Sequence, residues 1–127
     1  MAARRVALTG RDPFGEQLAA RGRVAMLETV GRITGKPVRS AVGFIESADG
    51  ALLIAAGSES AHWALNLRAQ PLCRATIGER AAAYMASQVD GPARSEALAG
   101  LILKYGTPAE RLGRGPVFRL IRPESRP

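Results

Sequence analysis

The 127-residue chain has 46% hydrophobic residues and a net charge of +7, which is typical of one globular domain large enough to bury its own core. The single cysteine, Cys73, excludes an intrachain disulfide and a thiolate metal cluster, and the single histidine, His62, excludes a histidine-rich metal site within one chain, so we expect no metal. The sequence has no apolar run of bilayer-spanning length and no sustained apolar segment at its start, so we expect a cytoplasmic protein with no integral membrane segment.

The positive charge is spread along the chain and is carried mostly by arginines. A basic surface favours anionic partners such as nucleic acid, anionic lipid or a phosphate-bearing cofactor. The planar guanidinium group suits two-pronged binding of phosphate or carboxylate. We expect no nucleic-acid partner, because only 5% of the residues are aromatic and no basic patch interleaves with aromatic residues.

The beginning of the chain differs from the rest. Residues 1–23 are predicted to form an N-terminal basic arm with a short helix at 12–21, and residues 24–127 to form the main domain. Within that domain, alternating or β-branched residues predict six strands: 24–30, 38–47, 51–56, 72–77, 81–89 and 117–122.

Short turns and helices connect these predicted strands. Asp49-Gly50 predicts a tight hairpin turn. Helices are predicted at 60–69, with Ser60 as its cap, and then at 92–105 and 107–113. No stretch resembles a parallel β–α–β unit. The predicted fold class is therefore α+β, mainly β: a small six-stranded antiparallel barrel with a few short helices.

The turn between the first two predicted strands is the most suggestive candidate site. Gly31 and Gly35 let the backbone bend sharply and direct its N–H groups outward, which favours an anion. Three basic side chains and one hydroxyl accompany them: Arg32, Lys36, Arg39 and Thr34. A phosphate site is one interpretation, and a plain hairpin turn with solvated basic side chains is the other.

Other candidate residues lie on the predicted helices. On the residues alone, Trp63 is expected to be a core residue and Asn66 to make a local hydrogen bond. Tyr105 could donate a proton near a redox centre, or could simply end the apolar stripe of its helix. No Ser/His/Asp triad is identifiable, since the lone histidine gives only one candidate, and no carboxylate pair stands out in a plausible cleft. The sequence therefore indicates that a cofactor carries any chemistry.

Two segments resemble the motifs of one known family. Residues 27–39 (LETVGRITGKPVR) resemble the signature LTTxGRKSGxxR of the deazaflavin (F420)-dependent nitroreductase family, and residues 63–71 (WALNLRAQP) resemble its signature WxxNLxAxP. The resemblance covers roughly residues 24–123 and implies a split β-barrel similar to those that bind flavin mononucleotide (FMN). It also implies a reductase that uses reduced coenzyme F420 to transfer a hydride to a quinone, an enone or a nitro compound.

The resemblance also implies roles for individual residues. The phosphate and acidic tail of F420 would be held by Gly31, Arg32, Thr34, Gly35 and Arg39. The deazaflavin ring, its edge and the pocket wall would involve Val42, Gly43, Ala56, Gly57, Ser58, Trp63 and Asn66. A proton would come from water, Ser58 or Tyr105, which makes these two the candidate catalytic residues.

One departure from the family pattern keeps alternatives open. Ile33 stands where the family usually has Lys or Arg, which removes one partner of the phosphate. A non-catalytic protein that binds FMN or a fatty acid on the same barrel is therefore the alternative function. Small barrels often pair, so a homodimer is also open, and no segment of the sequence decides it.

Overall fold

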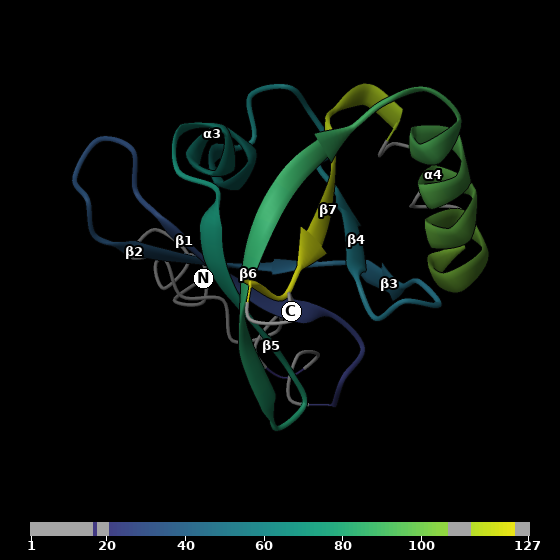
Figure 1. The fold of residues 1–127 in the computed structure, drawn as a ribbon, viewed down its shortest axis with the longest axis horizontal. Helices are drawn as coiled ribbons and strands as arrows, with labels where there is room; N and C mark the ends of the chain where they lie inside the picture. Colours follow the sequence, from purple (N-terminus) through teal and green to yellow (C-terminus); the bar gives the residue numbers. More distant parts are fainter. Residues whose placement is uncertain (1–16, 18–20, 107–112, 124–127) are drawn as a thin grey trace, which may run out of the picture.

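The computed structural model describes residues 17, 21–106 and 113–123. Residues 1–16 and 18–20 of the predicted N-terminal arm and its helix lie outside the described residues, and so do residues 107–112 of the helix predicted at 107–113. The elements of the described part, in chain order, are β1 (Ala25–Val30), β2 (Pro37–Val42), β3 (Phe44–Glu46), β4 (Leu52–Ala55), α3 (His62–Ala69), β5 (Leu72–Ile77), β6 (Arg80–Val89), α4 (Gly91–Tyr105) and β7 (Val117–Ile121) (Figure 1).

The seven strands of the described part form one antiparallel sheet in the order β2-β1-β5-β6-β7-β4-β3. Alternate residues of each strand point to opposite faces of a sheet. The inner face collects fully buried side chains from distant parts of the chain, among them Leu27, Ile54 and Leu120. This antiparallel, mainly β architecture confirms the predicted fold class.

The predicted count of six strands was wrong, because residues 38–47 form two strands instead of one. Val42 is paired with Ala25 of β1, whereas Phe44 is paired with Ile54 of β4. The chain therefore changes partners at Gly43, between β2 and β3. Since β2 and β3 are the two outermost strands of the sheet, this bend links both of its edges and curls it into a split barrel.

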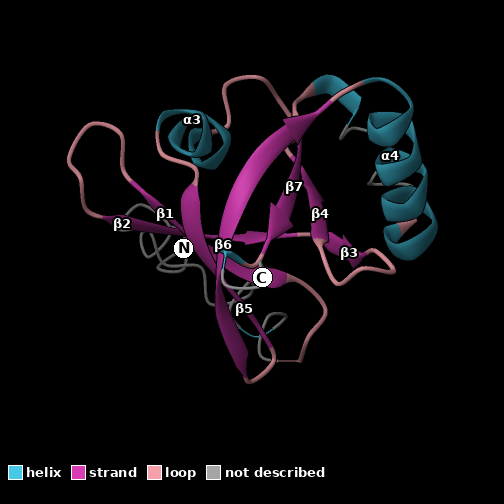
Figure 2. Ribbon diagram, in the orientation of Figure 1, coloured by secondary structure: helices cyan, strands magenta, loops and turns pink. Residues whose placement is uncertain are grey.

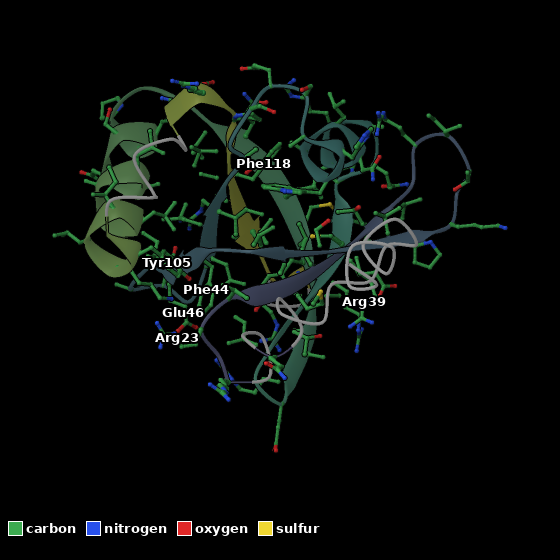
Figure 3. All side chains as sticks on the ribbon, turned by 180° about the vertical axis from the view of Figure 1, so that it is seen from behind. Arg23, Arg39, Phe44, Glu46, Tyr105 and Phe118 are labelled. Carbon is green, nitrogen blue, oxygen red and sulfur yellow. The ribbon has the colours of Figure 1, made fainter. Side chains whose placement is uncertain are left out.

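The end of α4 stabilises the bend at Gly43. Tyr105 packs so closely there that a Cβ atom on Gly43 would lie 3.0 Å from its ring. The Phe44 N–H donates to the Tyr105 hydroxyl at 3.0 Å, and that hydroxyl donates to the Arg23 carbonyl at 2.7 Å. Figure 3 shows Tyr105, Phe44 and Arg23 gathered at this corner. The Tyr105 side chain thus supplies hydrogen bonds where the strand ladder is interrupted.

The hairpin turn predicted at Asp49-Gly50 is confirmed. Gly50 has a φ of +89°, a conformation that favours glycine. The Asp49 carboxylate accepts hydrogen bonds from the Ser47 hydroxyl, the Arg119 guanidinium and, at 3.1 Å, the Ala51 N–H. These donors stabilise the charged form and hold the pKa of Asp49 well below its usual range.

The two longer helices lie on different sides of the sheet (Figure 2). Helix α3 contacts β1 and β2, and α4 contacts β3, β4 and β7. Helix α4 has Pro92 in its first turn and ends at Gly106 with a φ of +85°, as predicted. The cap predicted for α3 was wrong: Ala61 precedes the helix without a side-chain cap, and the Ser60 N–H bonds the Ser58 hydroxyl.

Neither α3 nor α4 combines the length and the apolar character that crossing a membrane would require.

Candidate functional site

A solvent-open cleft of about 370 Å³ separates the β1–β2 loop from α3. The ribbon places this loop and the start of α3 side by side, away from α4 (Figure 1). The cleft is lined by the loop, by β2 and by α3 through Gly31, Arg32, Ile33, Thr34, Val38, Arg39, Ser40, His62 and Asn66. Residues of both sequence motifs therefore meet in one place.

The β1–β2 loop owes its shape to its two glycines. A Cβ atom on Gly31 would lie 2.9 Å from the Lys36 carbonyl oxygen, and Gly35 adopts a φ of +76°. The Gly35 N–H donates to the Gly31 carbonyl at 2.8 Å, and the Lys36 N–H donates to the Thr34 hydroxyl at 3.1 Å. Within the described residues, the N–H groups of Ile33 and Thr34 donate to no acceptor. These two unused donors border the cleft.

Asn66 holds the loop against α3. Its side chain is 2% exposed, and its amide NH₂ donates to the buried Thr29 hydroxyl at 3.1 Å. Its amide oxygen accepts twice from Arg32, from the backbone N–H at 3.1 Å and from Nη1 at 2.8 Å. Asn66 thus fixes both the backbone and the guanidinium of Arg32. A buried side chain with all these bonds made positions its neighbours rigidly.

The charge in the cleft is positive. Arg32 and Arg39 both line it, and its described lining contains no carboxylate. Arg39 comes from β2, where it is paired with Glu28 of β1. Ile33 is 86% exposed at the tip of the loop and adds an apolar surface. The Arg32 guanidinium with the two backbone N–H groups of the loop fits an anionic group such as a phosphate or carboxylate. Arg39 lies on the face of β2 opposite Val38 and Ser40, so it borders the cleft from the other side of the strand.

Several of the residues predicted from sequence meet in this cleft: Gly31, Arg32, Thr34, Arg39 and Asn66. Gly35 and Lys36 belong to the same loop but do not line the cleft, and Gly35 borders a second cleft with Val30 and Leu72. Whether any of these residues binds a cofactor stays a prediction.

The residues predicted to contact the ring lie outside the cleft. Val42 and Ala56 are buried in the core, and Gly57 and Ser58 are exposed in the loop before α3. Trp63 is half-buried and packs on the core, with its ring centroid 6.1 Å from that of Phe118. Gly43 lies at the bend against Tyr105. Their proposed contacts with a ring also stay predictions.

The sequence as a whole matches the model of one protein family. The model described as F420H(2)-dependent quinone reductase matches residues 2–110. The chain belongs to this family. The match confirms the resemblance to F420-dependent reductases that the two motifs indicate. A search of curated protein sequences finds no match.

Solved structures share the fold of this F420H(2)-dependent quinone reductase family member. The heme storage protein HutZ from Vibrio cholerae matches with a TM-score of 0.70 and 20% identity, over 89% of this chain and 90% of its own. An F420-H2 dependent reductase (FDR-A) matches with 0.66 and 20%, over 78% and 94%. A domain-swapped dimer matches with 0.65 and 19%, over 86% and 95%. At these identities the likeness concerns the fold alone.

Tyr105, one of the two candidate catalytic residues, lies at the bend and not at the cleft of this F420H(2)-dependent quinone reductase family member. Figure 3 shows it across the molecule from Arg39. Its hydroxyl already bonds the Phe44 N–H and the Arg23 carbonyl. A catalytic role for Tyr105 stays a prediction, and these contacts favour a structural role.

Tyr105→Phe separates the two roles. Since the variant loses the bond to the Arg23 carbonyl and the acceptor for Phe44 N–H, we expect it to lower the free energy of unfolding by about 1–2 kcal/mol. Turnover per folded molecule should stay within about twofold of the unmodified protein. Denaturant unfolding and steady-state kinetics measure the two quantities. A large loss of kcat with unchanged stability would instead assign proton donation to Tyr105.

Cys73 takes no part in the cleft. Its thiol is buried on the inner face of β5, and desolvation raises its pKa to about 11. The thiol is therefore protonated and unreactive at neutral pH, as expected for a structural cysteine.

Four residues that line the cleft were not predicted from the sequence as binding residues: Ile33, Val38, Ser40 and His62. Val38 and Ser40 lie on β2, on the face opposite Arg39, and their inward orientation follows from strand alternation. The second motif could have indicated His62, because this residue directly precedes Trp63 and lies one helical turn before Asn66. That spacing was the available signal.

Proposed function

We propose that this protein is an oxidoreductase of the cytoplasm that transfers a hydride from reduced F420 to a small organic acceptor: a quinone, an enone or a nitro compound. The observation that carries the proposal is the cleft between the β1–β2 loop and α3. Its lining contains Arg32, Arg39 and the loop residues Ile33 and Thr34, whose backbone N–H groups have no acceptor among the described residues. Membership of the F420H(2)-dependent quinone reductase family supports the choice of cofactor.

The chain's own residues have defined tasks in this proposal. Arg32 and Arg39 bind the phosphate and acidic tail of F420, and the N–H groups of Ile33 and Thr34 complete the site. Asn66 keeps Arg32 in place, so the guanidinium does not need to be ordered when the ligand arrives. F420 supplies the hydride chemistry when it is bound, and the protein binds and orients it.

The remaining predicted contacts complete the proposed site. Gly35 and Lys36 support the anion-binding loop. The ring rests against Val42, Gly43 and Trp63, with its edge near the segment from Ala56 to Ser58. Ser58 has an exposed hydroxyl that can pass a proton to the reduced acceptor, and water at this exposed loop can do the same.

A pair of titrations tests the cofactor. We expect F420 to bind the purified protein. We also expect reduced F420 to be oxidised when a quinone, an enone or a nitro compound is added in the absence of oxygen. FMN titrated in parallel should bind more weakly, because it lacks the acidic tail beyond its phosphate. Absence of F420 binding would refute the proposal.

Binding of a ligand without catalytic turnover is the second candidate function. Ile33, 86% exposed at the cleft, offers an apolar contact where the family resemblance expects a basic side chain. FMN or a fatty acid could then occupy the same barrel, and the fold relative HutZ is described as a heme storage protein. Tight binding of FMN, a fatty acid or heme, with no oxidation of reduced F420, would favour this candidate.

We also propose that the protein forms a homodimer through an apolar row on the outer face of the sheet. The apolar row consists of Val30, Leu72, Met85 and Ile121, each 37–46% exposed. Met85 is paired with Leu72 on one side and with Ile121 on the other, so the row runs straight across three strands. Val30 joins its end, since it borders one cleft with Leu72.

The charges beside the apolar row suit a second copy of the same chain. Glu28 and Arg74 are paired neighbours in the next row of the sheet, two residues from Val30 and Leu72. Two copies related by a two-fold axis can place each Glu28 opposite Arg74 of the other copy, which makes two equivalent ion pairs.

Met85→Glu tests this interface. Because it places a charge at the centre of each apolar row, we expect it to weaken dimerisation by at least about tenfold. Analytical ultracentrifugation over a concentration series measures the change. Leu103→Glu is the matched control, since Leu103 is 87% exposed on α4 and lies outside the row. Equal effects of both substitutions would exclude the apolar row as the interface.

A further inference from the structure

The one histidine of the chain faces the proposed anion site. His62 is the first residue of α3 and lines the cleft with Arg32 and Arg39. Its Nδ1 atom lies 3.3 Å from Nη2 of Arg32. Nothing in the family motifs assigns a role to this side chain.

The contact with Arg32 bears on the hydrogen-bonding role of the His62 Nδ1 atom. A guanidinium has only hydrogen-bond donors, so Nδ1 must carry a lone pair to accept from Nη2. The tautomer that satisfies this contact carries its hydrogen on Nε2. A protonated imidazole would place an N–H against the guanidinium, and the contact would become repulsive.

The groups around His62 reinforce this preference. Arg32 from the loop contacts His62 and is positive. Arg39, the other charged residue of the cleft lining, is also positive and lies on the face of β2 opposite Val38 and Ser40. Glu59, three residues before His62, is directed to Arg68 of α3, 3.4 Å from its Nη2 atom. In the described part of the chain, no carboxylate lines the cleft to favour a charged imidazole. An anion in the cleft would supply the missing negative charge.

We propose that His62 is a proton-coupled binding residue for the anionic tail of the ligand. When a phosphate or carboxylate enters the cleft, His62 takes up one proton from solvent at Nδ1. Arg32 Nη2 is released from the imidazole and donates to the anion, and the charged imidazole also donates to it. Because binding and protonation favour each other equally, affinity for the anion rises as pH falls through the neutral range.

This inference deepens the proposed function and rests on it for the identity of the ligand, but the test separates the two. Sulfate is the first probe, because it keeps its charge of −2 from about pH 5.5 to about pH 8.5, the range in which histidine titrates. The imidazole resonances of the single histidine report the charge of His62 directly by NMR. At about pH 7.5, sulfate should move them toward the positions of a charged imidazole.

Affinities as a function of pH give the second readout. We expect sulfate to bind about five- to tenfold more tightly at pH 5.5 than at pH 8.5, a modest change because the cleft is open to solvent. His62→Gln, which cannot be charged, should remove the pH dependence. His62→Lys should bind as tightly at high pH as the unmodified protein does at low pH. Arg80→Gln, which removes a charge outside the cleft, should keep the pH dependence.

The outcomes distinguish the two proposals. Unmoved imidazole resonances at saturating sulfate, or the same pH dependence in His62→Gln, would overturn the role of His62. F420 is then titrated with the unmodified protein and with His62→Gln. If sulfate moves the His62 resonances but F420 does not bind, the proton-coupled site stands and the proposed function fails. If F420 binds with a pH dependence that His62→Gln leaves unchanged, the proposed function stands and the role of His62 fails.

Discussion

Arg32→Ala should weaken F420 binding by about 10- to 150-fold. A hydrogen bond to a charged group is worth about 1.5–3 kcal/mol, and each 1.4 kcal/mol changes affinity tenfold. Arg32 is held in place in the cleft, because the buried Asn66 accepts from both its backbone and its guanidinium. The affinity therefore depends on a charge that is already in position before the ligand arrives. A fluorescence titration with F420 measures the loss.

Two control variants separate the charge of Arg32 from other effects. Arg80→Ala removes one positive charge from an exposed position outside the cleft, so it should change the affinity by less than about twofold. Arg32→Lys keeps the charge but lacks the planar two-pronged group, so it should recover only part of the affinity. An affinity that Arg32→Ala leaves unchanged would refute the assignment of the anion site.

Gly115→Ala should lower the free energy of unfolding by about 2–4 kcal/mol. A Cβ atom at this position would lie 2.7 Å from the Ser58 carbonyl oxygen and would also meet the Ala56 carbonyl oxygen. Both neighbours are backbone atoms, so the close contact cannot be relieved by rotation of a side chain. For a domain of this size, the loss corresponds to a fall in Tm of about 10 °C.

The surrounding contacts prevent the Gly115 segment from moving aside. Arg94 of α4 donates through Nη2 to the carbonyls of Gly113, at 2.8 Å, and Gly115, at 2.9 Å. The Ala56 N–H donates to the Pro116 carbonyl at 2.9 Å. The added methyl group must therefore strain these bonds or displace the segment from Ala56 to Ser58, which the proposed function places near the ring.

Gly113→Ala is the matched control for Gly115→Ala. A Cβ atom on Gly113 would have no neighbour within 4 Å. The same chemical change two residues away should therefore alter stability by less than about 0.5 kcal/mol. Thermal unfolding of both variants measures the difference, and equal losses would show that backbone freedom matters here instead of close packing.

Most strand positions could be predicted because alternation and turn residues are local signals. The bend at Gly43 could not. Residues 38–47 keep one alternating pattern, and only the pairing of Val42 with Ala25 and of Phe44 with Ile54 reveals two strands. Each of these pairings crosses a loop, and Tyr105, which stabilises the bend, lies 61 residues from Phe44 in the sequence. A local pattern contains no information about such a contact.

The candidate site, like the fold, could be predicted from the sequence only in part. The glycines and Arg32 of the first motif were predictable, because a tight turn rich in arginine and glycine has a local chemical meaning. The bonds from Arg32 to Asn66 and His62 span 34 and 30 residues and depend on how α3 packs on β1. Sequence reasoning could place Asn66 on a helix, but it could not identify what its amide holds.

The bend between β2 and β3 also bears on self-association into aggregates. An unbroken strand along residues 37–46 at the border of the sheet would present one long row of unpaired backbone groups to foreign chains. The bend instead divides it into six- and three-residue pieces at opposite borders. The longer piece begins with Pro37, which cannot donate, and carries the charged Arg39. The path that curls the sheet therefore also limits how well another strand could be added to it.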